Sequence, residues 1–166
     1  MTGPECEIEA IETALGDLAR LFDSPRVHER RVQGSGVQLS RTGLRCLTLV
    51  DQLGPVSVTK LATVMDLSQA TASRAIAALE ADGLLARSVD PGDGRVTYCT
   101  TTASGRRALQ RVQKFMHGQL SLALEGMPPA RRRDLASTLA ELIQRLQSVP
   151  AHTTGQPVAG REESTS

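Results

Sequence analysis

The chain has few aromatic residues: no Trp, one Tyr and two Phe among 166 residues. Proteins that stack several bases on aromatic platforms, as many single-strand and RNA readers do, need more than this. It also has only three cysteines, Cys6, Cys46 and Cys99, which are odd in number and far apart. Neither a disulfide framework nor a paired zinc motif is therefore expected. Any small-molecule pocket must be lined mainly by aliphatic side chains and Met.

Long apolar runs are missing as well. No stretch of about 18 apolar residues occurs, and the beginning of the chain does not resemble a signal peptide, so we expect a cytoplasmic protein. His28, His117 and His152 are scattered, without Cys or carboxylate at metal-ligand spacing. No nucleophile–base set or phosphate-binding glycine loop is present. We expect no enzyme activity, no catalytic residues, no metal and no cofactor.

The formal net charge is only +1, but the basic residues are clustered. They lie at Arg26, Arg30, Arg31, Arg41 and Arg45, at Arg106, Arg107, Arg111 and Lys114, and at Arg131 to Arg133. Any one such cluster is ordinarily a solvent-exposed helix face. Charge alone therefore does not identify a partner.

The first 53 residues predict two helices. The first carries an apolar seam with alternating spacings of three and four residues, at Ile8, Ile11, Leu15, Leu18 and Phe22. Pro25, the charged stretch after it and Gly34-Ser35-Gly36 predict a loop. Ser40 is expected to cap a second helix from Arg41 to about Leu53, which Gly54-Pro55 ends.

Residues 56–83 predict two short helices joined by a tight turn. Ser57 and Ser68 are each placed to cap one, only Asp66-Leu67 separates the two, and Gly83 closes the second. Helices joined this closely cross steeply, as in a helix-turn-helix. Spacing alone leaves open an ordinary tight corner of an all-α protein.

A hairpin and two further helices complete the predicted fold. β-prone runs at 84–89 and 96–101 flank a Pro-Gly-Asp-Gly turn, and a hairpin directly after a helix-turn-helix is a winged-helix arrangement. Thr102 is expected to cap a helix from Ala103 to about Leu124, and another follows Met127-Pro128-Pro129. Residues 149–166 have the composition of a disordered tail.

The second short helix has the face of a DNA-reading helix. Ala72, Ile76 and Leu79 are expected inward, which leaves polar and small side chains at its N-terminal end. Arg contacts guanine, Gln contacts adenine, and Ser, Thr and Ala contact bases, phosphates or the thymine methyl. An unliganded polar face is the alternative. The expected base-reading set is Ser68, Gln69, Ala70, Thr71, Ser73 and Arg74.

Arg95 at the hairpin tip is the candidate minor-groove contact. A narrow A·T minor groove concentrates negative potential and attracts an inserted arginine. Asp93 is close enough in sequence to orient the guanidinium. A simple surface ion pair in a turn is the alternative, although such a pair is worth only about 0–1 kcal/mol. Arg41 and Arg45 are expected to contact the DNA backbone.

The segment LATVMDLSQATASRAIAALEADGLLARSVDPGDGRVTYCTTTASG, residues 61–105, resembles the MarR family of winged helix-turn-helix transcription regulators. The resemblance covers the helix-turn-helix, its LE..GL..R exit, the DP.D.R wing and the T..G start of the next helix, and the flanking helices match in number and order. It implies a mainly α fold of about six helices with a small β-wing, in an intertwined homodimer. Arg74 takes a base-contacting position and Arg95 that of the wing arginine. Two residues depart from the family pattern. Asp66 stands where Gly is common, and Gly94 stands where a charged residue is common.

The terminal leucine stripes predict a homodimer independently, because a small winged-helix core cannot cover both. We expect dimerisation helices at 1–36 and 103–148 around a DNA-binding domain at 37–102. The expected dimerisation residues are Ile8, Ile11, Leu15, Leu18, Leu135, Leu139, Leu142 and Leu146.

The sequence thus predicts a homodimeric regulator, expected to be a repressor, that binds a pseudo-palindromic double-stranded DNA operator. Release by a small-molecule effector is an expectation from the resemblance. A thiol-oxidation response through Cys6 is a weaker alternative, since Glu5 and Glu7 flank it and negative neighbours disfavour the thiolate. A winged-helix module that binds proteins instead of DNA is the other alternative; it predicts no salt-dependent DNA affinity.

Overall fold

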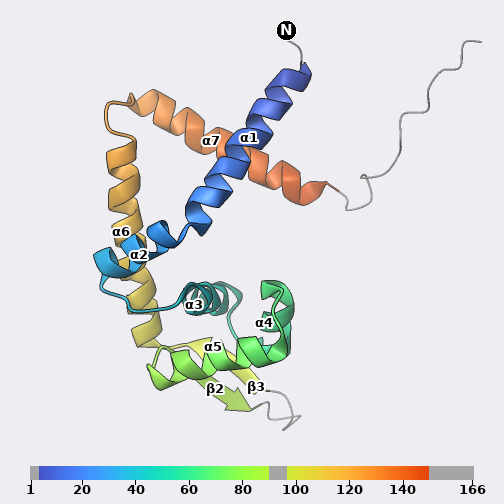
Figure 1. The fold of residues 1–166 in the computed structure, drawn as a ribbon, viewed down its shortest axis with the longest axis vertical. Coiled ribbons are helices and arrows are strands. Elements are labelled where there is room, and N and C mark those ends of the chain that lie inside the picture. The colour runs from blue at the N-terminus through green and yellow to red at the C-terminus, as the bar shows by residue number, and fades with distance from the viewer. Residues whose placement is uncertain (1–3, 90–96, 150–166) are drawn as a thin grey trace, which may run out of the picture. The chain divides into compact units, whose positions relative to one another are not determined.

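The computed structural model describes residues 4–89 and 97–149. Within these ranges the chain forms seven helices and a small antiparallel sheet (Figure 1). It divides into two compact units, residues 1–120 and 121–166. Asp93, Arg95 and the predicted tail from residue 150 lie outside the described residues.

The elements follow the predicted order with two additions, α2 and β1. The helices are α1 (Pro4–Asp23), α2 (Pro25–Ser35), α3 (Arg41–Leu53), α4 (Val58–Met65), α5 (Gln69–Ala81), α6 (Ala103–Ala123) and α7 (Pro129–Ser148), and the strands are β1 (Val56–Ser57), β2 (Leu85–Val89) and β3 (Thr97–Thr101). Among the described residues, no helix is both long enough and apolar enough to cross a membrane.

Short polar side chains start four of these helices, as predicted. Each caps by accepting a hydrogen bond from the backbone N–H three residues further on, which satisfies a donor that has no partner inside the helix. The oxygens are Ser40 Oγ with Gly43 (3.0 Å), Ser57 Oγ with Lys60 (3.2 Å), Ser68 Oγ with Thr71 (3.2 Å) and Thr102 Oγ1 with Gly105 (3.0 Å). These four contacts set where α3, α4, α5 and α6 begin.

The prediction of a loop at residues 25–36 is wrong, because residues 25–35 form α2. Ser24 Oγ accepts from the Val27 N–H (3.4 Å), and Pro25 occupies the first turn, where its missing N–H costs nothing. Gly34 lies inside α2, at a position where no larger residue fits. A Cβ there would come within about 2 Å of the Phe115 ring on α6. The glycine is therefore a packing contact between α2 and α6.

The sheet has the strand order β1-β3-β2, with both pairings antiparallel. Leu85 pairs with Thr101 and Val89 with Thr97, so β2 and β3 form the predicted hairpin arms. β1 adds only Val56 and Ser57 to the other edge of β3. Two residues carry no alternation of polar and apolar side chains, which is why this strand was not predicted.

One hydrophobic core lies between α3, α4, α5, the sheet and the start of α6, and we call this part of unit 1 the head (residues 37–108; Figure 1). Its fully enclosed side chains are Cys46, Leu47, Val50, Leu61, Ile76, Leu79 and Cys99. The predicted inward residues of α5 are confirmed as buried, and Cys46 and Cys99 are confirmed as packing residues. Among the described residues, the core contains no buried polar or charged side chain.

Gly105 lets α6 approach the head closely. A Cβ at this position would come to 2.2 Å from the Leu84 carbonyl oxygen and 2.8 Å from Thr101 Cγ2. Thr102 Oγ1 also donates to the Gly83 carbonyl (2.7 Å). The first turn of α6 is thus fixed to the end of α5 and to the base of the hairpin.

Helices α1 and α7 keep most of their large apolar residues exposed. On α1, Ile8 and Ile11 are 58% and 49% accessible. On α7, in the other unit, Leu135 and Leu139 are 40% accessible and Leu146 is 56% accessible. Neither helix contributes a buried residue to a core in the single chain.

Candidate nucleic-acid interface

The turn between α4 and α5 positions the start of α5. Asp66 ends α4 in the left-handed conformation, with φ of 55°, and its N–H bonds to the carbonyls of Ala62 and Thr63. It is the only non-glycine residue with positive φ in the described chain. Left-handed backbone is what Gly provides in related turns, and Asp is among the residues that tolerate it best. The departure from the family pattern at Asp66 therefore preserves the turn.

The exposed N-terminal end of α5 presents most of the predicted base-reading residues to solvent. Gln69, Ala70 and Arg74 are exposed, whereas Thr71 and Ser73 are partly buried. The Ser68 side chain caps α5 by accepting a hydrogen bond from the Thr71 N–H, and its Oγ also lies 2.9 Å from Thr71 Oγ1. The first turn of α5 is therefore a small, rigid polar surface.

Two contacts fix the long side chains on this surface. Gln69 Nε2 donates to Thr59 Oγ1 of α4 (2.9 Å), and an Arg74 NH2 group donates to Thr71 Oγ1 at 3.4 Å. Arg74 has no ion pair with any residue that the structure describes. Its guanidinium keeps most of its five donors free, as bidentate recognition of guanine requires.

The base of the wing is braced against α5. Arg87 Nε on β2 lies 3.0 Å from Glu80 Oε2 near the end of α5, and both side chains are only partly exposed. This ion pair connects the hairpin to the α5 helix. The wing-tip candidates Asp93 and Arg95 lie outside the described residues, so their proposed pairing stays a prediction.

Arg41 and Arg45, predicted as DNA-backbone contacts, both line a hollow of about 900 Å³ between α1, α2, α3, α4 and α6. An Arg41 NH2 group donates to Asp23 Oδ1 at 2.7 Å, which links α3 to the end of α1. Sequence spacing could not reveal this contact, because the two residues are 18 positions apart. Their role on DNA remains untested.

The same hollow contains residues that the sequence did not single out. Arg31 of α2 lies 5.2 Å from the centroid of the Phe22 ring of α1, and its Nε donates to Met116 Sδ of α6 (3.2 Å). His28 Nε2 is 3.0 Å from the Leu39 carbonyl oxygen. Asp23 is the one carboxylate among the lining residues, against three arginines. The hollow combines apolar walls with an excess of positive charge.

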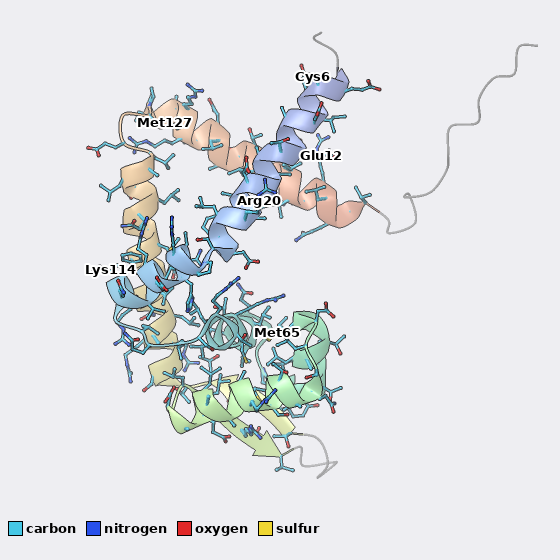
Figure 2. The ribbon with its side chains drawn as sticks, in the orientation of Figure 1. Cys6, Glu12, Arg20, Met65, Lys114 and Met127 are labelled. Carbon is cyan, nitrogen blue, oxygen red and sulfur yellow. The ribbon has the colours of Figure 1, made fainter. Side chains whose placement is uncertain are left out.

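The thiols lie in two different environments. Burial, with a smaller contribution from the nearby Cys99, raises the pKa of the Cys46 thiol to about 11. Burial also raises the pKa of Cys99, although Arg87 opposes the shift. Cys6 is exposed near the start of α1 (Figure 2). No group of three or more His, Cys, Asp or Glu side chains in the described part of the chain is arranged to hold a metal.

Known proteins of similar sequence are described as regulators. Residues 39–97 match the model of the MarR family. The chain is 41% identical over 76 residues to the uncharacterized HTH-type transcriptional regulator YxaD of Bacillus subtilis, a match that covers 46% of this chain and 53% of that protein. The chain thus spans about half the length of this relative. It is 28% identical to the HTH-type transcriptional regulator YwaE of the same bacterium, over 89% of this chain and 82% of that protein.

Solved structures share the fold. A MarR family protein from Bacillus stearothermophilus has a TM-score of 0.75 at 18% identity, over 88% of this chain and 99% of that one. The crystal structure of MarR has a TM-score of 0.61 at 17% identity, over 86% of this chain and 98% of that one. Residues 39–97 thus match the MarR family, and the winged helix-turn-helix described above has the fold of these solved structures.

Proposed function

We propose that the protein is a sequence-specific, double-stranded DNA-binding transcription regulator. The observation that carries this proposal is the N-terminal surface of α5, where exposed Gln69 and Arg74 extend from a capped first turn. Arg74 forms no ion pair with a residue that the structure describes. An α-helix with such a surface fits the major groove, where side chains distinguish all four base pairs. The relatives named as HTH-type transcriptional regulators support it.

The base-reading residues are Ser68, Gln69, Ala70, Thr71, Ser73 and Arg74, as expected from the sequence. Arg95 enters the minor groove, and Asp93 orients it. Arg41 and Arg45 remain candidates for the DNA backbone, although Arg41 would have to leave Asp23 to reach a phosphate. Protein–DNA complexes use such phosphate contacts to fix register and base contacts to specify sequence.

The functional species is a homodimer on a pseudo-palindromic operator. Its support is the exposed apolar seam of α1 and the exposed leucines of α7, which the single chain leaves uncovered. Packing them against a second copy removes this surface from water, and twofold symmetry places two α5 helices about 34 Å apart, on successive major grooves. The dimerisation domains are residues 1–36 and 103–148.

The regulator acts as a repressor. The support is a relative at 24% identity, the HTH-type transcriptional repressor IacR of Pseudomonas putida, whose match covers 75% of this chain. A dimer bound across a promoter excludes polymerase without needing a further contact. A reporter placed behind the operator tests the sign: deletion of the protein raises expression for a repressor and lowers it for an activator.

Binding and base reading are tested by fluorescence anisotropy on duplexes selected from a random-sequence library. Arg95→Ala weakens binding to all sequences through the lost minor-groove contact. Arg74→Ala weakens binding and also relaxes the preference at one base pair, by about 1–3 kcal/mol. Titration at two salt concentrations separates phosphate from base contacts. Equal affinity of the wild type and both variants would contradict the proposal.

A small-molecule effector binds in the hollow beside the head. The hollow is large enough for a ligand, since binding sites range over about 300–1,000 Å³. Its excess of arginines over carboxylates suits an anion with an apolar body. The test compares small carboxylic acids with their neutral amides as agents that release fluorescent operator. Release by the acids alone supports the assignment, and release by neither or equally by both contradicts it.

A further inference from the structure

Thr59, on the first turn of α4, is hydrogen-bonded to the surface of α5 that is proposed to read DNA. Gln69 Nε2 donates to Thr59 Oγ1 at 2.9 Å, across ten positions of the chain. Both residues are exposed. Figure 1 shows α4 beside the start of α5. The contact therefore brings a residue that the sequence did not single out to the N-terminal end of α5.

Both ends of this hydrogen bond are fixed by their own helices. Ser57 Oγ caps the start of α4, and Leu61, two residues after Thr59, is fully buried. Ser68 caps α5 directly before Gln69. Threonine also has few rotamers in a helix, because its β-carbon is branched. The Thr59 hydroxyl therefore lies at a set position relative to Gln69.

The packing of α4 against α5 does not depend on this hydrogen bond. Leu61 and Met65 of α4 are buried in one core with Ile76 of α5, whereas Thr59 and Gln69 are exposed. A hydrogen bond at the surface replaces bonds to water, so its net contribution to stability is small. The contact is therefore better suited to orient a side chain than to hold two helices together.

The hydrogen bond restricts which groups Gln69 turns toward a duplex. A carboxamide has one acceptor oxygen and two N–H donors, and its last torsion angle is broadly distributed in a free side chain. An unrestrained Gln turns either its oxygen or its nitrogen to a base edge, and so fits donors and acceptors alike. Thr59 takes one of the two N–H donors. The oxygen and the second N–H remain, and this pair binds the N6 amino group and N7 of adenine.

We propose that Thr59 is a positioning residue for base recognition: it holds the Gln69 carboxamide in the orientation that selects adenine in the major groove. This inference rests on the proposed function. It assigns a role on DNA to a residue of α4 that acts through Gln69. Specificity is a difference between affinities, so loss of the restraint admits other base pairs without weakening all binding. The signature is a reduced preference at one base pair in each half-site.

The test is Thr59→Val in the full chain, which replaces the hydroxyl by a methyl group of similar size. Thr and Val have similar helix propensities, so this exposed position tolerates the change. Thr59→Ser keeps a hydroxyl and is the rescue variant. Thr63→Val is the matched control, because Thr63 is also exposed on α4 and its Oγ1 donates to the Thr59 carbonyl (3.1 Å), not to α5.

Fluorescence anisotropy measures the base preference on a library-selected duplex and its single-base-pair variants. Gln69→Ala first identifies the base pair that Gln69 reads. At that base pair, Thr59→Val is expected to lower the preference for A·T by about three- to tenfold, the effect of losing one hydrogen bond. Affinity for a random-sequence duplex should stay that of the wild type. In the Gln69→Ala background, Thr59→Val should have no further effect, because it acts through Gln69.

The outcomes separate this inference from the proposed function. A loss of preference at the Gln69 base pair alone, restored by Thr59→Ser and absent from Thr63→Val, supports the positioning role. Unchanged preference in Thr59→Val or in Gln69→Ala, an equal loss in Thr63→Val, a uniform fall across all sequences, or an additive effect in the Gln69→Ala background overturns it. Sequence-specific binding by the wild type leaves the regulator standing in each of these cases. If the wild type binds duplexes without sequence preference, the proposed function fails and the role of Thr59 fails with it.

Discussion

The head buries its large aliphatic side chains, whereas helix α1 leaves side chains of the same kind exposed to solvent. In the head, Leu47 and Ile76 are fully enclosed, whereas Ile8 of α1 is more than half accessible. Burying a side chain of this size stabilises a fold by about 1.5–3 kcal/mol. The head therefore satisfies its own hydrophobic requirement within one chain. The α1 helix does not, and its seam stabilises the protein only when a second surface covers it.

The largest effect is expected in the head. Ile76→Ala removes a fully buried side chain between α5 and the rest of the core, leaves a cavity and lowers the free energy of unfolding by about 2–5 kcal/mol. Urea denaturation followed by circular dichroism measures it. Ala78→Gly, at an exposed position of α5, is the control and costs no more than about 1 kcal/mol. Equal losses would mean that helix propensity, not packing, holds α5 in place.

The seam of α1 should behave in the opposite way. Leu18→Glu puts a charge into the proposed dimer interface, and its burial without a partner raises the dimer dissociation constant at least roughly a hundredfold. Sedimentation equilibrium measures the association. Native-state hydrogen exchange of the head should stay protected, since α1 contributes no residue to its core. Unfolding of the head in this variant would show that the two regions are not independent.

A smaller effect is expected where α6 meets the head. Gly105→Ala pushes a methyl group against the Leu84 carbonyl and costs about 1–3 kcal/mol through overpacking. Gly118→Ala on the same helix meets nothing within 4 Å and gains up to about 1 kcal/mol, because Ala favours the helix. Thermal melting compares the two variants. If both lower the melting temperature equally, the close approach at Gly105 has no special role.

Much of the head could be predicted because its signals are local. Ser40, Ser57, Ser68 and Thr102 mark helix starts through contacts three residues away. The wing could be recognised from two β-prone runs on either side of a Pro-Gly-Asp-Gly turn. Pro25 was misleading, since the same residue that breaks a helix interior also begins one. A proline alone cannot distinguish the two, and Ser24 was the signal that could have done so.

Of the candidate sites, the one formed by sequence neighbours could be predicted, and the one formed by distant residues could not. The α5 surface could be predicted because its residues are neighbours in the sequence. The hollow could not be predicted, because Phe22, Arg31 and Met116 come together only through the packing of α1, α2 and α6. The role of Gly34 was hidden for the same reason, since its neighbour Phe115 lies 81 positions further along the chain.

The smallest effect concerns pH. The Cys46 thiol has a pKa of about 11 in the folded protein against 9.0 for an ordinary thiol, so the folded state holds this proton more tightly. Its contribution is fully present below about pH 9 and is lost as pH rises towards 11. Urea denaturation between pH 8 and 11 should therefore give a shallower decline for Cys46→Ala than for the wild type.

Cys6→Ala is the control for this pH series, because Cys6 lies exposed on α1, outside the head. Its curve should follow that of the wild type. If Cys6→Ala flattens the curve as much as Cys46→Ala does, the buried thiol is not the source of the decline. Alkylation at pH 8 counts the accessible thiols directly. We expect one thiol to react quickly in the native protein and three after unfolding.

The central claim is that a self-sufficient head reads DNA while uncovered helices hold two heads together. Sedimentation velocity of the complex with a library-selected duplex, combined with footprinting, tests it most directly. We expect two protomers per duplex and two protected half-sites about 10 base pairs apart from centre to centre. A single protomer on the duplex, or protection with no paired half-site, would contradict it.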